Sequence, residues 1–249
     1  MMFWLAGFFA LVALIYSSVG FGGGSTYTAL LGLWGVDYRL IPTISLLCNI
    51  IVVSGSTIRF ARARLVNWSA VAPLLVVSAP LAFIGGLVPL KQGVFLLILG
   101  SALLVSAAAL IVQPEKMTER KLSKPALLAI AGAIGLVAGL SGIGGGIFMA
   151  PVLHLVRWAE GRRIAAFATL YILINSTTGL AGQIIKAGPQ FLASPAQEYW
   201  PLLIAVLLGG QLGSMIGLRY LTPRLLRTLT ALLVGYVAVR LLWQSWSLI

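Results

Sequence analysis

The sequence contains few of the residues on which enzyme active sites and disulfide-bonded domains depend. Its 249 residues include five carboxylates, one histidine and one cysteine. A single cysteine excludes an intrachain disulfide, and we expect Cys48 to be a small core residue rather than a reactive thiol. No metal or other cofactor is expected. Charged residues make up only 9% of the chain, which excludes an ordinary soluble domain.

Apolar residues, in contrast, are in excess. They make up 60% of the sequence, and the mean hydropathy is +1.04. These values predict an all-α polytopic protein of the lipid bilayer. The net charge of +12 does not indicate a nucleic-acid partner, because the Lys and Arg residues are dispersed between apolar runs. That distribution is typical of membrane topology.

The apolar segments predict two halves separated by a polar connector at residues 113–124. The first half, residues 1–112, has segments at 3–36, 40–58, 65–90 and 93–112. The second half, residues 125–249, has segments at 125–156, 164–185, 199–218 and 225–246. We interpret the Gly- and Pro-rich stretch 186–198 as an irregular loop.

A run of glycines lies in the middle of the first segment of each half. The runs are Gly20-Phe21-Gly22-Gly23-Gly24 and Gly142-Ile143-Gly144-Gly145-Gly146. Each glycine costs a helix about 1 kcal/mol relative to alanine, so helix propensity does not explain them. Backbone that leaves the helix within a membrane is tolerated where it is buried in protein or lines a cavity, and broken helices mark transport sites. Close helix packing is the alternative explanation.

Other matches between the halves indicate an internal duplication. The matching residues are Thr43, Leu47 and Asn49 with Thr169, Leu173 and Asn175, at an offset slightly longer than that of the glycine runs. Pro73-Leu74-Leu75 also matches Pro201-Leu202-Leu203. Because the first apolar segment recurs in the second half, we interpret it as structure and not as a cleaved signal peptide.

The distribution of basic residues decides between crossing segments and hairpins. If all eight segments cross the bilayer, the 17 basic residues divide almost equally between the two sides. If both glycine segments are re-entrant hairpins, one side collects thirteen and the other keeps only Arg39, Lys91, Lys186 and Arg240. Cytoplasmic loops are enriched in Lys and Arg, so the hairpin arrangement is favoured and the basic side is cytoplasmic.

This arrangement places both termini outside the plasma membrane and the connector 113–124 in the cytoplasm. Each half then has three true crossings, so the two repeats are inverted. A pseudo-two-fold axis in the membrane plane would bring the two glycine tips together. The seven Trp residues agree with this topology, because all of them lie near segment ends, as an aromatic belt requires.

A helix that begins at mid-membrane presents unpaired N–H groups and the positive end of its dipole, which favour an anion. Glycine lets that anion approach the backbone. Ser25 and Thr26 can add hydroxyl donors, and Asn49 and Asn175 can add amide donors, although both amides could instead join helices. No charged residue is placed mid-span. The candidate substrate-binding residues are Gly22, Gly23, Gly24, Ser25, Thr26, Asn49, Gly144, Gly145, Gly146 and Asn175.

The motifs Ser18-Val19-Gly20-Phe21-Gly22-Gly23-Gly24 and Leu140-Ser141-Gly142-Ile143-Gly144-Gly145-Gly146, the second followed by Pro151, resemble the paired signatures of the TauE/SafE family of sulfite exporters. The resemblance covers nearly the whole chain. It implies a secondary transporter that exports sulfite, an organosulfonate or a related sulfur-containing anion. We expect a link to protons, and because no carboxylate lies mid-span, the proton could travel on the substrate itself. Ala29 stands where the second half has Pro151, so the two tips need not bind equally.

Two other functions stay open. A passive anion channel is the nearer alternative, since hairpins that meet at mid-membrane also build channels. An intramembrane hydrolase using Ser25 or Ser141 is disfavoured, because a nucleophilic serine needs a base within reach and the sole histidine, His154, is distant in sequence. We expect His154 to be an interfacial histidine rather than a proton relay. The expected partners are a small anion and the bilayer, and a homodimer stays open.

Overall fold

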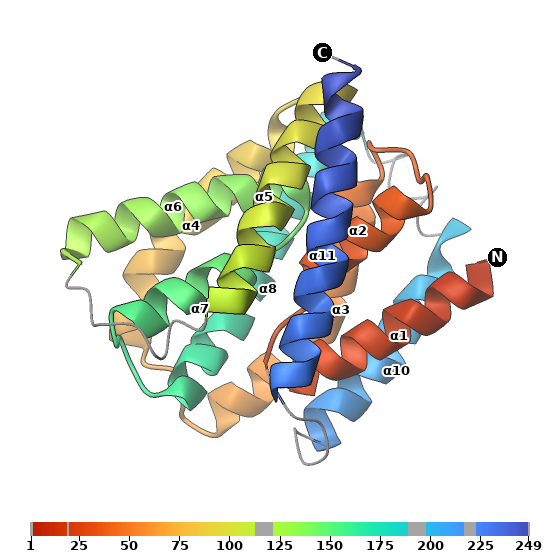
Figure 1. Cartoon of the computed structure of the whole chain (residues 1–249). Helices are drawn as coiled ribbons and strands as arrows, with labels where there is room; N and C mark the ends of the chain where they lie inside the picture. The colour runs from red at the N-terminus through yellow and green to blue at the C-terminus, as the bar shows by residue number, and fades with distance from the viewer. Residues whose placement is uncertain (1, 19, 113–121, 189–197, 217–222, 249) are drawn as a thin grey trace.

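The computed structural model describes residues 2–18, 20–112, 122–188, 198–216 and 223–248. These residues form ten α-helices and no strand, which confirms the all-α prediction for the part of the chain described (Figure 1). The helices of the first half are α1 (Met2–Ser18), α2 (Gly24–Leu33), α3 (Ile41–Arg62), α4 (Trp68–Leu87) and α5 (Gln92–Val112). Those of the second half are α6 (Lys124–Ser141), α7 (Gly146–Leu155), α8 (Gly161–Ala187), α10 (Trp200–Ile216) and α11 (Pro223–Trp246).

Helices extend into the ends of the two stretches that the sequence predicts to be non-helical. Most of the predicted connector, residues 113–121, lies outside the described residues, and α6 begins at its end, where the Ser123 hydroxyl caps the helix by accepting from the Ala126 N–H. The predicted loop 186–198 begins later than expected, because α8 continues to Ala187 and ends at Gly188. Residues 189–197 of that loop lie outside the described residues.

The glycine run divides each hairpin segment into two helices. In the first segment α1 and α2 flank the run, and in the second α6 and α7 do so. Gly20 and Gly142 have φ of +85° and +80°, and Gly23 and Gly145 have +88° and +81°. L-residues with a side chain rarely adopt these left-handed values, so glycine is needed at the same two places in each break.

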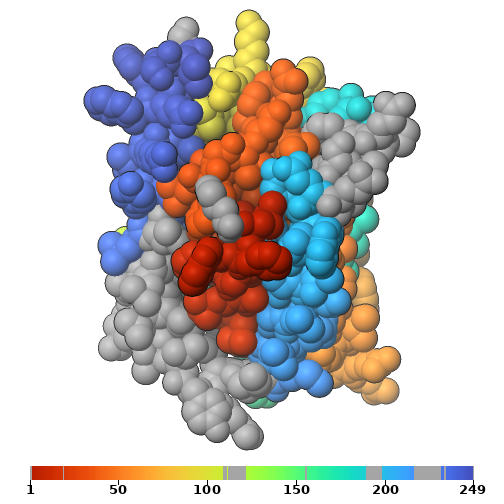
Figure 2. All heavy atoms as spheres, turned by 90° about the vertical axis from the view of Figure 1, so that its right-hand side faces the viewer, coloured from red at the N-terminus to blue at the C-terminus, as the bar shows by residue number. Residues whose placement is uncertain are grey.

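The first arm of each hairpin packs on a helix of the other half. Helix α1 lies along α10 (Figures 1 and 2), and α6 lies along α4 (Figure 1). Glycines make both approaches close: a Cβ on Gly213 of α10 would overlap the Leu14 carbonyl of α1, and one on Gly139 of α6 would overlap the Ala82 carbonyl of α4. Such contacts between small residues are typical of helix pairs in membranes. Each half therefore supplies the support for the other half's hairpin.

Helices α3 and α8 form the centre of the bundle, where they pack on each other. Each has two thirds of its membrane-length window buried. Outside them, α5 and α11 run side by side (Figure 1). Aromatic side chains stabilise both glycine segments. Phe9 of α1 stacks on Tyr27 of α2, with the ring centroids 4.7 Å apart. The Tyr171 hydroxyl of α8 donates a hydrogen bond to the Ala131 carbonyl of α6 at 2.6 Å.

The outer surface is apolar, as a lipid-facing surface requires. Large exposed side chains include Trp4, Val76, Met215, Trp243 and Trp246. Within the part of the chain that the structure describes, four helices are long and apolar enough to cross a membrane, namely α3, α4, α6 and α8. Helix α6 is in this group although it is the first arm of a predicted hairpin. It ends at Gly142, a buried residue inside the bundle.

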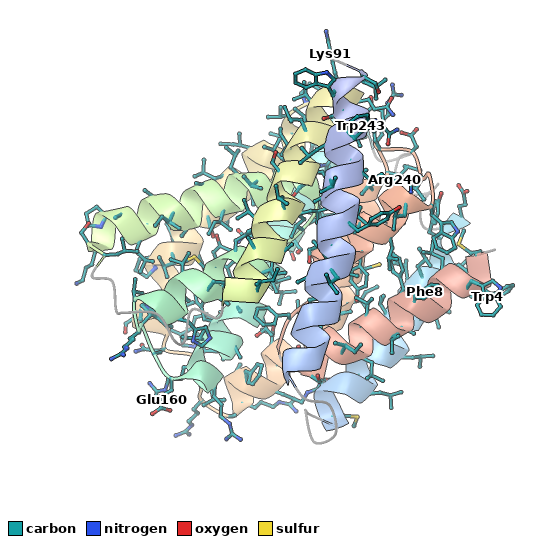
Figure 3. All side chains as sticks on the ribbon, in the orientation of Figure 1. Trp4, Phe8, Lys91, Glu160, Arg240 and Trp243 are labelled. Carbon is teal, nitrogen blue, oxygen red and sulfur yellow. The ribbon has the colours of Figure 1, made fainter. Side chains whose placement is uncertain are left out.

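Charged residues gather at the ends of the bundle rather than along its middle. Lys91 and Arg240 lie toward the end where α5 begins and α11 finishes, together with Trp243 (Figure 3). Glu160, which belongs to the basic turn between α7 and α8, lies at the opposite end (Figure 3). The predicted topology assigns Lys91 and Arg240 to one side and this turn to the other.

Candidate functional site

The two glycine runs lie in contact in the interior of the bundle. Gly24, the first residue of α2, packs so closely on the carbonyl oxygen of Ile143 that a Cβ there would overlap it. Gly142 packs equally closely on α3, where a Cβ would lie 2.5 Å from the Cα of Pro42. Residues 22–25 and 142–147 are all buried. The two runs therefore meet, as the duplicated pattern predicts, and in this conformation their backbones touch.

Both tips have a backbone geometry suited to an anion. Gly23 and Gly145 are left-handed N-cap residues, and a right-handed helix follows directly from each. Such a change of hand turns successive N–H groups toward one point and forms an anion-binding nest. The N–H groups of Gly24 and Ser25, and those of Gly146 and Ile147, belong to first helical turns and have no acceptor within the helix. The positive ends of the α2 and α7 dipoles add to this field.

Asn49 of α3 lies between the two runs. A Cβ on Gly22 would be 2.5 Å from its Oδ1, and Cβ atoms on Gly24 and Gly144 would be 2.5 Å and 2.8 Å from its Nδ2. The Nδ2 group donates to the carbonyl oxygens of Ile143, at 3.3 Å, and Gly142, at 3.5 Å. The sequence predicts that this amide donates to the ligand. In this conformation its N–H groups are directed to the second tip instead.

The Asn49 oxygen has a different environment from the nitrogen. The Asn49 side chain is fully buried, and Oδ1 has no hydrogen-bond partner among the described residues. Leaving a buried carbonyl without a donor costs about 1–3 kcal/mol, so such groups are rare unless a ligand or water completes them.

Three residues at the tips are absent from the set predicted from sequence. The Ser45 hydroxyl donates to the Gly142 carbonyl at 2.8 Å and lies 3.3 Å from that of Gly24, so it joins the two runs. Ile172 of α8 is the nearest neighbour of a Cβ placed on Gly146 and also adjoins Gly22 and Gly144. The Ser176 hydroxyl, one turn further, would be 3.0 Å from a Cβ on Gly144 and has no partner among the described residues.

Other predicted residues lie nearby but face different groups. The Thr26 hydroxyl lies 3.0 Å from the Tyr16 hydroxyl of α1, within its own hairpin. Cβ atoms on Gly23 and Gly145 would meet Val12 with Tyr27, and Ile134 with Tyr171, so these glycines also face their own hairpin or its support. Ser25 is buried beside Gly24. Thr26, Gly23 and Gly145 therefore shape the tips more than they line the space between them.

Asn175 is buried in α8, and neither atom of its amide makes a hydrogen bond with a described residue. It is not among the nearest neighbours that a Cβ on any glycine of the two runs would meet. The nearest neighbours from α8 at the tips include Ile172 and Ser176 instead.

The residues of α3 and α8 that contact equivalent glycines are not the residues that match in the sequence comparison of the two halves. Gly142 meets Pro42 where Gly20 meets Ala165, and Gly24 meets Asn49 where Gly146 meets Ile172. By these contacts the counterpart of Asn49 is Ile172, not Asn175. The site is accordingly asymmetric, with an amide against one tip and a branched apolar side chain against the other.

No charged side chain is fully buried in the part of the chain that the structure describes. The buried polar groups there belong to Ser, Thr, Asn and Gln, as well as to tyrosines. An anion at the tips would then be held by backbone dipoles and neutral groups. Such a site binds charge without a full counter-charge.

A cavity of about 470 Å³ opens at the end of the bundle that carries Lys91. Its lining comes from the α2–α3 turn and from the facing ends of α5 and α11: Gly32, Gly35, Val36, Asp37, Tyr38, Arg39, Ile41, Gln92, Leu96, Leu241 and Gln244. Arg39 donates to the Tyr38 hydroxyl at 3.3 Å, and this bond, with the charge of Asp37, raises the pKa of the guanidinium. Ile41, which lines the cavity, is followed by Pro42, the residue on which Gly142 packs.

The opposite end of α3 carries a second polar group. Arg59 donates to Oε1 of Gln211 on α10, at 3.3 Å and 3.4 Å, and to the hydroxyl of Ser214. Asn49 lies between these two ends of the helix. Helix α3 thus connects the cavity, the tips and Arg59.

Comparisons with known proteins agree with the motifs. The family model described as Sulfite exporter TauE/SafE matches residues 4–241. A relative described as "Probable membrane transporter protein y4hK" of Sinorhizobium fredii (strain NBRC 101917 / NGR234) is 34% identical over 243 residues, which cover 94% of this chain and 96% of the relative. No solved structure matches the chain.

Proposed function

Since the chain belongs to the sulfite exporter TauE/SafE family and is therefore a multi-pass membrane transporter rather than an enzyme, we propose that it exports a small sulfur-containing anion. The cargo is sulfite or an organosulfonate, bound between the two glycine tips, and the flux is linked to the proton gradient. The hydrolase alternative is set aside, because the family is one of exporters.

The observation that carries the proposal is the meeting of two helix N-termini around one amide. Both tips turn from a left-handed glycine into a right-handed helix, and Asn49 lies against both. Two positive dipole ends that face each other would repel in the absence of a ligand, and an anion between them relieves this repulsion. The proposed ligand groups are the first-turn amides of α2 and α7, with Ser25, Asn49 and the Asn175–Ser176 edge of α8.

The conformation described here does not hold an anion between the tips, because Gly24 and Ile143 are in contact. Binding then requires the tips to separate. The cavity lined by Ile41 offers an approach, since Ser45 and Asn49 follow on the same helix at about 6 Å and 12 Å along its axis. Alternation between touching and separated tips gives a carrier rather than an open channel.

We expect purified protein in liposomes to accumulate sulfite against its gradient when a pH difference is imposed. A carrier coupled to protons does this because the downhill proton flux drives the anion. Collapse of the pH difference with an ionophore is the control, and it should abolish accumulation but leave slow equilibration. A passive channel would equilibrate sulfite with or without the pH difference, and that result would refute the carrier.

We expect both termini outside and the segment before α6 in the cytoplasm. In a Cys48→Ser background, Lys91→Cys should react with an impermeant thiol reagent added outside intact cells, and Ser123→Cys should react only after permeabilisation. Cys48 is buried, so its replacement removes the single native thiol without changing the surface. External labelling of Ser123→Cys would exclude this topology.

A further inference from the structure

The orientation of the Asn49 amide is fixed by its neighbours. If the amide were reversed, Oδ1 would lie against the carbonyl oxygens of Gly142 and Ile143, which are 3.5 Å and 3.3 Å from the present Nδ2 position. Three oxygen acceptors would then face one another without a proton. The nitrogen therefore donates to the carbonyls of the second tip, although it also lies against Gly24, and the oxygen lies against Gly22 of the first tip.

The group that Asn49 offers at the first tip is consequently a hydrogen-bond acceptor. Its Oδ1 is buried and without a partner among the described residues, and it faces Gly22, which has no side chain to cover it. The next backbone groups along the chain are the first-turn N–H groups of α2, at Gly24 and Ser25. These are donors. A ligand at this tip meets donors and one acceptor together.

A fully deprotonated oxyanion satisfies the donors but repels the acceptor, because both present lone pairs. From this arrangement we infer that the Asn49 amide keeps this orientation when the tips separate, and that the site then selects anions that carry a hydrogen-bond donor of their own, such as hydrogensulfite or a hydroxyl-bearing sulfonate. The anionic oxygens accept from the α2 and α7 amides, and the ligand's O–H donates to Asn49 Oδ1. Asn49 is thus the residue that determines specificity. This inference rests on the proposed function and narrows its substrate class.

The test compares 2-hydroxyethanesulfonate with ethanesulfonate, which have the same charge and differ by one hydroxyl group. Each is used to inhibit sulfite transport by the purified protein in liposomes. We expect the hydroxyl compound to inhibit at about ten-fold lower concentration, the effect of one buried hydrogen bond. In Asn49→Ala the ratio of the two inhibitory concentrations should fall to about one. Ser106→Ala, which removes a buried hydroxyl that donates to the Ala102 carbonyl within α5, should keep the ten-fold ratio.

The wild-type ratio decides the question even if Asn49→Ala does not fold. Equal inhibition by the two compounds, or no inhibition by either, with sulfite transport intact, overturns the inference and leaves the proposed function standing. A ten-fold ratio that persists in folded Asn49→Ala also overturns it. If neither sulfite nor an organosulfonate is transported, the proposed function fails and the inference falls with it.

Discussion

Replacing Gly24 by alanine should reduce sulfite transport about 100-fold while the protein stays folded. The added Cβ would overlap the carbonyl oxygen of Ile143 and lie 2.5 Å from Asn49 Nδ2, so the tips could no longer touch. Overpacking of the touching tips costs up to about 3 kcal/mol, or roughly 100-fold in the population of the closed state. Transport requires that state, because the carrier alternates between touching and separated tips.

Gly7→Ala is the matched control, since it makes the same substitution on α1, the helix before the same glycine run. A Cβ there would have no neighbour within 4 Å. Both variants gain helix propensity. Flux in liposomes and the melting temperature of purified protein should therefore separate them. Equal flux in the two variants would show that tip contact is not needed, and a shared loss of folding and flux in Gly24→Ala would mark Gly24 as a packing residue.

Gly23 and Gly145 are less informative targets, although the sequence singles them out equally. Both have positive φ, so any side chain strains the backbone before it meets a ligand. A loss of transport in Gly23→Val would combine this strain with contact to Tyr27 and Val12.

Asn49→Asp should abolish transport, with a loss of more than about 100-fold. The substitution keeps the shape but removes the N–H groups that reach the carbonyls of Gly142 and Ile143, and it sets an ionised carboxylate against two oxygens and an incoming anion. An unpaired buried charge costs about 3–5 kcal/mol. Asn49→Ala loses only hydrogen bonds and should fall less, by roughly ten-fold or somewhat more.

The control is Asn67→Asp, the same change at the exposed N-cap of α4. Its oxygen already accepts from the Ser69 hydroxyl at 2.8 Å, and a carboxylate is favourable at a helix N-terminus. Sulfite flux should be unchanged there. If Asn49→Asp and Asn49→Ala transport equally well in folded protein, Asn49 does not face the substrate.

Much of the fold follows from local sequence signals. Glycine at Gly20, Gly23, Gly142 and Gly145 breaks two apolar segments at left-handed positions, and that chemistry is visible without coordinates. The apolar runs predict the other helices because each needs only a length and a composition. Which helix packs on which does not follow in this way, because the contacts of Gly139 and Gly213 with distant carbonyls depend on the whole bundle.

The candidate site was predicted only in part, because some of its contacts also depend on how the helices of the two halves pack together. Asn49 stands out as an amide within an apolar helix, and Ser45 could have been found from it, since residues four apart share a helix face. The direction of the Asn49 amide could not, because it depends on the carbonyls of Gly142 and Ile143, which come from the other half. Likewise the pairing of Asn49 with Ile172 depends on a small register difference between α3 and α8 that sequence matching does not detect.

The packing of α1 on α10 and of α6 on α4 affects the order in which the protein can fold during its synthesis. Helix α1 is synthesised first, but its partner α10 begins only at Trp200. Until α10 is synthesised, Gly209 and Gly213, which pack on α1, are absent, and α1 lacks its packing partner in the membrane. Neither half can mature alone. If the gene were divided at the connector, each product would be an incomplete protein that needs the other one, in equal amounts, to become a transporter.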